Sequence, residues 1–178
     1  MAASGRTVPD VIAPALRVLF CGINPSLYTA AVGHHFARPG NRFWKALAGA
    51  RLTDRVLAPE EERELLGLGL GITNLVDRAT ASAAELTADE LRAGARALTA
   101  KVEQWRPGCV AFVGLDAYRR AFGRPRARVG PQAERLGPAS VWLLPNPSGL
   151  QAYYQLPDLV AAFGTLADNL EVAPPPAT

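Results

Sequence analysis

The chain has 178 residues, of which 49% are apolar and 20% are charged, with a net charge of +3; this composition is typical of one globular domain with a substantial core. No apolar run approaches the ~18 residues that a membrane-spanning helix needs, and residues 1–6 lack the charged and then apolar pattern of a secretory signal. We therefore expect a cytoplasmic protein with no membrane partner. The two cysteines lie in apolar runs and the two histidines are adjacent, so we expect buried thiols and neither a metal nor another cofactor.

Strands and helices alternate along the chain. The run 17–22 is continuously apolar, which is typical of a strand that is buried on both faces. Further strands are predicted over residues 72–76, 110–114 and 140–144. Helical signals include a proline at a first turn, Pro59, and a capping box from Thr87 to Glu90. Together with apolar periodicity they predict helices over 42–48, from 59 onward, from 88 to about 105, over 115–122 and over 156–170.

This alternation predicts an α/β fold with a central, mostly parallel sheet that helices cover on both faces. The sequence has no internal repeat and no linker, so residues 1–172 are expected to form a single domain. The proline-rich tail, 173–178, is expected to be disordered. The 18-residue polar stretch 23–40 is expected to be a loop, and loops of this length in compact domains are usually functional.

Two of the strands are each followed by an Asn-Pro turn, at Asn24-Pro25 and at Asn146-Pro147. Proline keeps the residue before it out of helical geometry, so each asparagine is held near the end of its strand. Loops at the carboxyl ends of neighbouring parallel strands form the ligand crevice of α/β proteins. We therefore expect the two loops to form two sides of one site.

In the first loop, Asn24 offers one acceptor oxygen and two amide hydrogens and cannot ionise near neutral pH. It can orient a water or a ligand group, but it cannot act as a strong general base. Phe36, further along the loop, can stack on a planar ring. The alternative is structural, with an Asx turn at Asn24 and a core contact by Phe36. His34 and His35 are expected to be exposed to solvent, with contact to phosphate as the alternative.

In the second loop, Leu150 follows Ser148 and Gly149 and precedes Gln151. An apolar side chain at a loop tip can enter between base steps as a wedge, while its polar neighbours read base edges. A single leucine on the surface is also an ordinary feature.

Arginine makes up nearly all of the basic residues, because lysine occurs only at positions 45 and 101. Five arginines fall within ten residues, whereas the acids gather over 54–64 and 85–90. This segregation suits a basic face toward a polyanion; genome composition is the alternative cause. The clustered residues are Arg119, Arg120, Arg124, Arg126 and Arg128.

Five sequence blocks together resemble the mismatch-specific uracil/thymine-DNA glycosylases, a branch of the uracil-DNA glycosylase superfamily. The resemblance extends from about Ile12 to Leu170, and the blocks follow the family's order: Gly22-Ile23-Asn24-Pro25, Phe36-Ala37, Asn41-Arg42-Phe43-Trp44-Lys45, residues 71–78 and residues 144–150. It implies a three-layer α/β/α sandwich and an enzyme of base-excision repair. Such an enzyme flips uracil, or a related pyrimidine such as thymine or etheno-cytosine opposite guanine, out of duplex DNA and hydrolyses its N-glycosidic bond.

The resemblance also implies roles for residues of both loops. Asn24 would position the hydrolytic water, Phe36 would stack on the flipped base, and main-chain groups of Ile23 and Phe36 would bind the base edge. Thr29 and Asn74 are further expected substrate-binding residues. The expected DNA-binding residues lie in the second loop, where Leu150 would fill the vacated stack; they are Asn146, Ser148, Gly149, Leu150 and Gln151.

Two positions depart from the family's pattern. Ser26 stands where the first motif usually has glycine, which would narrow the floor of the pocket. Gln151-Ala152 replaces a polar residue and an arginine, so no arginine contact is carried over to this loop.

Asp77 is a second catalytic candidate, because Asn24 cannot take a proton. It follows the strand expected at 72–76, and a carboxylate that reached the pocket would supply a general base. The alternative is a surface or capping acid paired with Arg78. Asp116 also follows a strand but is expected to begin a helix.

Neither lysine lies in a pocket motif, which favours a monofunctional glycosylase without lyase activity. The implied partner is double-stranded DNA with G·U or G·T mismatches. We expect a monomer that needs no cofactor and is associated with the nucleoid when bound to DNA. The alternative function is a mismatch- or abasic-site-binding module with negligible catalysis.

Overall fold

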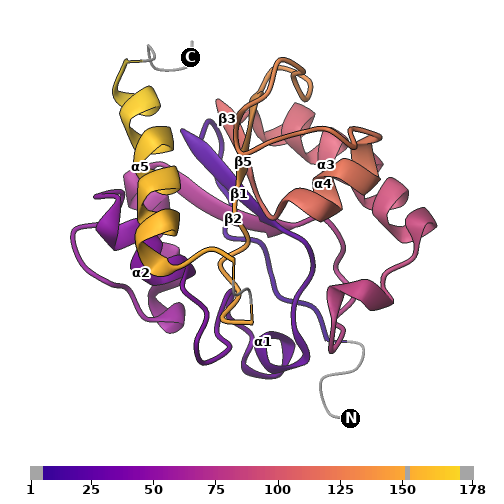
Figure 1. The fold of residues 1–178 in the computed structure, drawn as a ribbon, viewed down its shortest axis with the longest axis horizontal. Coiled ribbons are helices and arrows are strands. Elements are labelled where there is room, and N and C mark those ends of the chain that lie inside the picture. Colours follow the sequence, from indigo (N-terminus) through magenta and orange to yellow (C-terminus); the bar gives the residue numbers. More distant parts are fainter. Residues whose placement is uncertain (1–5, 151–152, 173–178) are drawn as a thin grey trace.

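The structure, a computed structural model, describes residues 6–150 and 153–172. Its central sheet has the strand order β2-β1-β3-β5-β4 (Figure 1). Four strands run parallel, namely β1 (Val18–Gly22), β2 (Leu70–Asn74), β3 (Cys109–Val113) and β5 (Ser140–Leu144). The short strand β4 (Gly130–Pro131) pairs antiparallel with β5 at one edge. The predicted mostly parallel sheet is confirmed.

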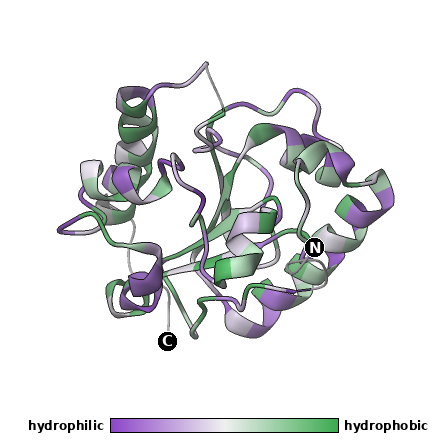
Figure 2. Cartoon of the chain, turned by 90° about the horizontal axis from the view of Figure 1, so that it is seen from below, coloured by the Kyte–Doolittle hydropathy of each residue, from purple (hydrophilic) through white to green (hydrophobic). Residues whose placement is uncertain are grey.

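Helices cover both faces of this sheet (Figure 1). On one face, α2 (Phe43–Gly49), the 3-10 helix η1 (Pro59–Leu68) and α5 (Leu156–Val172) pack over a core that includes Phe20 and Phe163. On the other, α3 (Ala88–Trp105) and α4 (Leu115–Phe122) pack over a core that includes Phe112. The strands are mainly hydrophobic, and hydrophilic residues lie mainly on the outer helices and loops (Figure 2). The predicted three-layer α/β/α sandwich is confirmed.

Several element bounds follow from local chemistry. Helix α3 begins at the predicted capping box, where the Thr87 hydroxyl accepts from the Glu90 N–H at 3.1 Å and the Glu90 carboxylate accepts from the Thr87 N–H at 2.8 Å. Helix α4 and strand β5 have the predicted bounds. Strand β2 begins and ends two residues earlier than predicted, because its parallel pairing with β1 runs from Val18↔Leu70 to Gly22↔Asn74.

The stretch 23–40 is not one loop, and this expectation was wrong. It contains the short helix α1 (Leu27–Val32). The Ser26 hydroxyl caps the helix by accepting from the Thr29 N–H at 3.0 Å, and Gly33 ends it with a φ of 79°. With only six residues, this helix is too short to show a clear apolar period in the sequence.

Cys21 and Cys109 are buried and unpaired, as predicted, and burial raises the pKa of both thiols, that of Cys109 to about 11. Within residues 6–150 and 153–172, no group of three or more histidine, cysteine or acidic side chains could hold a metal ion. None of the helices in this part of the chain combines the length and the apolarity that crossing a membrane requires. The predicted disorder of 173–178 concerns residues outside the described part.

Candidate functional site

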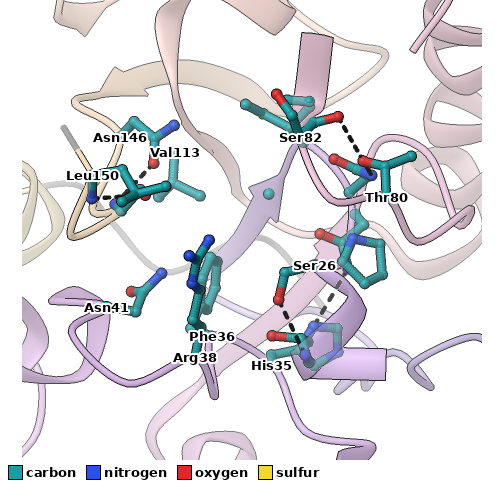
Figure 3. Close-up of a pocket in the computed structure, with 18 of the residues that line it drawn as sticks. Ser26, His35, Phe36, Arg38, Asn41, Thr80, Ser82, Val113, Asn146 and Leu150 are labelled. Atoms are coloured by element: carbon teal, nitrogen blue, oxygen red, sulfur yellow. Dashed lines mark hydrogen bonds between the residues drawn. The ribbon is translucent and has the colours of Figure 1, made fainter. Parts of the chain in front are cut away.

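A cavity of about 280 Å³ opens at the carboxyl edge of the sheet (Figure 3). It is lined by Gly22 at the end of β1, Asn74 at the end of β2, Val113 at the end of β3 and Asn146 just after β5. Strands β2 and β3 flank β1 on opposite sides, so the cavity lies at the topological switch point, where open α/β sheets bind ligands. Its volume is at the small end for ligand pockets and suits one ring-sized group.

The side chain of Asn24 is held in one orientation in this cavity. Its amide nitrogen donates to the Arg78 carbonyl and to the Thr80 hydroxyl, both at 2.8 Å. The Thr80 hydroxyl donates in turn to the Ser82 carbonyl at 2.8 Å, so it can only accept from Asn24. Because both amide hydrogens of Asn24 are used, its oxygen is left as an acceptor for a further donor.

Phe36 presents an aromatic ring to the cavity from an unusual backbone conformation. Its φ is 51°, in the left-handed region that bulky residues rarely adopt. The ring stacks on the fully buried Phe43, with centroids 4.1 Å apart and an angle of 27° between the planes. Since Phe43 backs the ring and Phe36 also lines the cavity, a planar group in the cavity can stack against it.

His35 is buried, so its expected exposure to solvent was wrong. Its backbone N–H donates to the carboxylate of Glu62, 27 residues away, at 2.8 Å, and the same carboxylate lies 3.2 Å from Nδ1 of His34. Burial lowers the pKa of His35, which favours the neutral ring. Nε2 lies 2.8 Å from the Pro9 carbonyl and therefore carries the ring hydrogen, while Nδ1 is an acceptor.

Asn74 lies between His35 and the floor of the cavity. Its amide nitrogen is 3.4 Å from the accepting Nδ1 of His35, which assigns the amide oxygen to the other side. That oxygen lies above Gly22, where a Cβ would be only 2.6 Å from it. Asn74 therefore adds a second fixed acceptor to the cavity lining.

The second loop faces the first across the same cavity, as expected (Figure 3). The Asn146 side-chain oxygen accepts from the Ser148 N–H at 2.9 Å, and the Ser148 hydroxyl accepts from the Leu150 N–H at 3.2 Å. These turns leave the Leu150 side chain 74% exposed at the rim. Gly149 is exposed, and Gln151 lies outside the described residues.

Asp77 is the one predicted catalytic residue that the structure does not bring to the cavity. It is exposed, lies three residues beyond the end of β2 and does not line the cavity. Arg78 is paired not with Asp77 but with Glu90, at 2.6 Å. Thr29, by contrast, is buried and lines the cavity from α1, and Ile23 lines it directly after β1.

Arg38 is the only permanently charged side chain among the described residues that line the cavity. It is exposed and lies beside Phe36 and Asn41, facing the rim that carries Leu150 (Figure 3). The clustered arginines 119–128 do not line the cavity, and Arg119 and Arg124 interact with the Ala127 carbonyl and Glu134. Contact of that cluster with DNA stays a prediction.

Sequence reasoning assigned no role to Arg38, Thr80 or Arg42. Thr80 orients Asn24 from 56 residues away, and Arg42 binds the second loop from more than 100 residues away. A side chain whose partner is this distant carries no local signal. Ser26, treated as a departure in the pocket floor, caps α1 and also lines the cavity.

Together, the fold and the site define an α/β/α protein with a ring-sized pocket, an oriented amide and an exposed apolar loop tip. The family model of the uracil DNA glycosylase superfamily matches residues 9–168, and the chain belongs to this superfamily. The fold is similar to the solution NMR structure of a candidate uracil DNA glycosylase from Methanosarcina acetivorans, with a TM-score of 0.60 and 19% identity over 91% of this chain and 98% of that chain. Membership of the superfamily supports a DNA glycosylase activity.

Proposed function

We propose that this protein is a mismatch-specific, monofunctional uracil-DNA glycosylase. The observation that carries the proposal is an amide oxygen, that of Asn24, held by two hydrogen bonds in a ring-sized cavity that faces the exposed Leu150. Uracil, or thymine and related pyrimidines opposite guanine, would be flipped from duplex DNA into this cavity. Flipping costs a few kcal/mol and less at a mismatch, so G·U and G·T pairs are favoured before any chemistry.

The flipped base would be held by stacking and by hydrogen bonds. Its plane would lie against Phe36, and its edge would meet main-chain groups of Ile23 and Phe36, with Thr29 beside it. The Asn74 oxygen would accept the imino hydrogen at N3 of uracil or thymine. Cytosine has no hydrogen at N3, so the same oxygen would face a lone pair and disfavour it.

The proposed chemistry is hydrolysis without a general base in the pocket. The bond from C1′ to the base breaks and its electron pair leaves with the base, whose negative charge N–H donors stabilise. A water oriented by the Asn24 oxygen adds to C1′, and its proton passes to solvent, from which the base anion is protonated. Lys45 is exposed outside the cavity, and Lys101 is paired with Asp10 at 2.5 Å, which supports a reaction without a lysine adduct.

The test is a base-release assay on defined duplexes that carry G·U, G·T, A·U and G·etheno-cytosine pairs. We expect release from mismatches and an intact abasic strand that breaks only after alkali treatment. Strand cleavage without alkali would contradict the monofunctional assignment. Tight binding of mismatched or abasic duplexes without any release would instead establish the binding module.

Thr80→Val is expected to slow uracil release about 10-fold, because the Asn24 amide loses one of its two acceptors and is freer to rotate. Valine keeps the shape of threonine, and Thr80 is buried. Single-turnover rates on a G·U duplex measure the effect, and Thr165→Val on α5, where the hydroxyl bonds only the Ala161 carbonyl, is the matched control. A Thr80→Val rate equal to wild type would show that this hydrogen bond does not position Asn24.

Arg38→Ala is expected to weaken duplex binding and to lower the slope of log K against log salt by about 0.9, the value for one phosphate contact. The reason is that Arg38 is an exposed cation at the rim through which the flipped nucleotide would enter. Fluorescence anisotropy at several salt concentrations measures the slope. Arg63→Ala, an exposed arginine on η1 outside the cavity lining, controls for net charge; equal slopes in the two variants would contradict a specific contact by Arg38.

A further inference from the structure

The side chain of Arg42 makes several hydrogen bonds to the second loop. Its Nη2 donates to the Ser148 carbonyl at 2.8 Å, its Nε donates to the Pro147 carbonyl at 3.4 Å, and its Nη1 donates to the Tyr154 carbonyl. The Arg42 main-chain N–H also donates to the Pro147 carbonyl, at 3.0 Å. The guanidinium therefore bonds the loop on both sides of Leu150.

A backbone contact beside Arg42 fixes the same loop. Gly149 packs so closely on Gly40 that a Cβ on Gly149 would lie 2.6 Å from the Gly40 carbonyl oxygen. Residues 40–42 thus contact and support the second loop, and they directly follow the segment that carries Phe36 and Arg38. The segment that carries the Phe36 ring therefore continues directly into the residues that contact the loop of Leu150.

We propose that Arg42 is a positioning residue that holds Leu150 in its inserting geometry before DNA binds. The proposal rests on the proposed function, since it assigns Leu150 the role of a wedge. A loop that is ordered in advance loses little conformational entropy when it enters the duplex. Arginine suits this role because its planar fork reaches several carbonyls at once, whereas lysine presents a single ammonium group.

The proposal separates base flipping from bond cleavage. Leu150 acts on the equilibrium between stacked and flipped base. Loss of Arg42 therefore shifts this equilibrium toward the stacked base. The step after flipping depends on Asn24 and is unaffected. Because Arg42 acts only through the loop, its loss has little effect once the Leu150 side chain has been removed.

The experiment uses the full chain and a duplex with 2′-fluoro-deoxyuridine, which resists cleavage, opposite guanine and next to 2-aminopurine. Arg42→Lys, Leu150→Ala and the double variant are compared with wild type by 2-aminopurine fluorescence, which reports unstacking, and by single-turnover release from a cleavable duplex. We expect Arg42→Lys to lower both signals about 10-fold, from loss of the forked hydrogen bonds. In the Leu150→Ala background the same change is expected to add almost nothing.

Two results would overturn the inference. One is a wild-type flipping signal in Arg42→Lys. The other is an equal loss from Arg42→Lys in the wild-type and in the Leu150→Ala background, which would assign Arg42 to general folding. The thermal midpoints of Arg42→Lys and of Arg42→Gln test that outcome directly. Failure of the proposed function is distinct, because then wild type itself neither unstacks nor releases uracil.

Discussion

Replacing Asn24 by alanine is expected to slow uracil release by about 100-fold or more while leaving the affinity for mismatched duplex nearly unchanged. A misplacement of about 1 Å in a reacting group already costs roughly this much, and Asn24→Ala removes the oriented acceptor altogether. The side chain is half-buried in the cavity lining and its amide nitrogen bonds groups of the protein itself, so we expect its loss to remove few contacts with DNA. Single-turnover rates on a G·U duplex and binding to an uncleavable analogue measure the two effects separately.

Asp77→Asn is the matched control, because Asp77 is exposed and outside the described lining of the cavity. We expect it to release uracil at the wild-type rate. A strong loss in Asp77→Asn would mean that its carboxylate reaches the substrate when DNA is bound and acts as the base. Wild-type release by Asn24→Ala would remove the water-positioning role and with it the proposed mechanism.

The rate is expected to follow the quality of the leaving base, with 5-fluorouracil faster than uracil and thymine slower, by roughly tenfold or more at each step. The described lining of the cavity contains no carboxylate, and burial lowers the pKa of His35, which favours its neutral ring; we therefore expect no side chain of this lining to protonate the base as it leaves. The stability of the base anion then sets the barrier, and a change of about 1.4 kcal/mol alters the rate tenfold.

The measurement is the single-turnover rate for the three bases, each opposite guanine in the same duplex. Binding of the uncleavable analogues is measured in parallel, so that a weaker fit of the methyl group of thymine is separated from slower chemistry. A flat series would mean that flipping or another step before cleavage limits the rate. The pocket would then stabilise the leaving base less than proposed.

The elements predicted accurately are those that local chemistry specifies. The capping box at Thr87 and Glu90 places the start of α3 through hydrogen bonds between residues three apart. The segment 140–144 becomes β5 because its four apolar residues, 141–144, are typical of a buried strand. The two Asn-Pro turns were sufficient to place both loops at one edge, since parallel strands all end on the same side of a sheet.

Most of the predictions that were wrong concern features that depend on contacts between residues far apart in the sequence. His35 follows another histidine and a glycine and has no local signal for burial, but Glu62 binds its backbone and Pro9 accepts from its ring. Strand β2 is shifted because pairing with β1, and not its own composition, sets its ends. Helix α1 instead depends on the Ser26 cap at its start and on the left-handed Gly33 at its end, in a segment too short to show an apolar period.

The sequence by itself determined the α/β class, the order of most elements and the identity of both loops, because these depend on periodicity, caps and turn residues that are adjacent in the chain. Only the tertiary structure decided how the site is assembled. Hydrogen bonds to Arg78 and Thr80 orient Asn24, and His35 orients Asn74. Asp77 lies outside the cavity, and Arg42 binds the loop that carries Leu150. A hydrogen bond between residues far apart in the chain depends on folding to bring its donor and acceptor together.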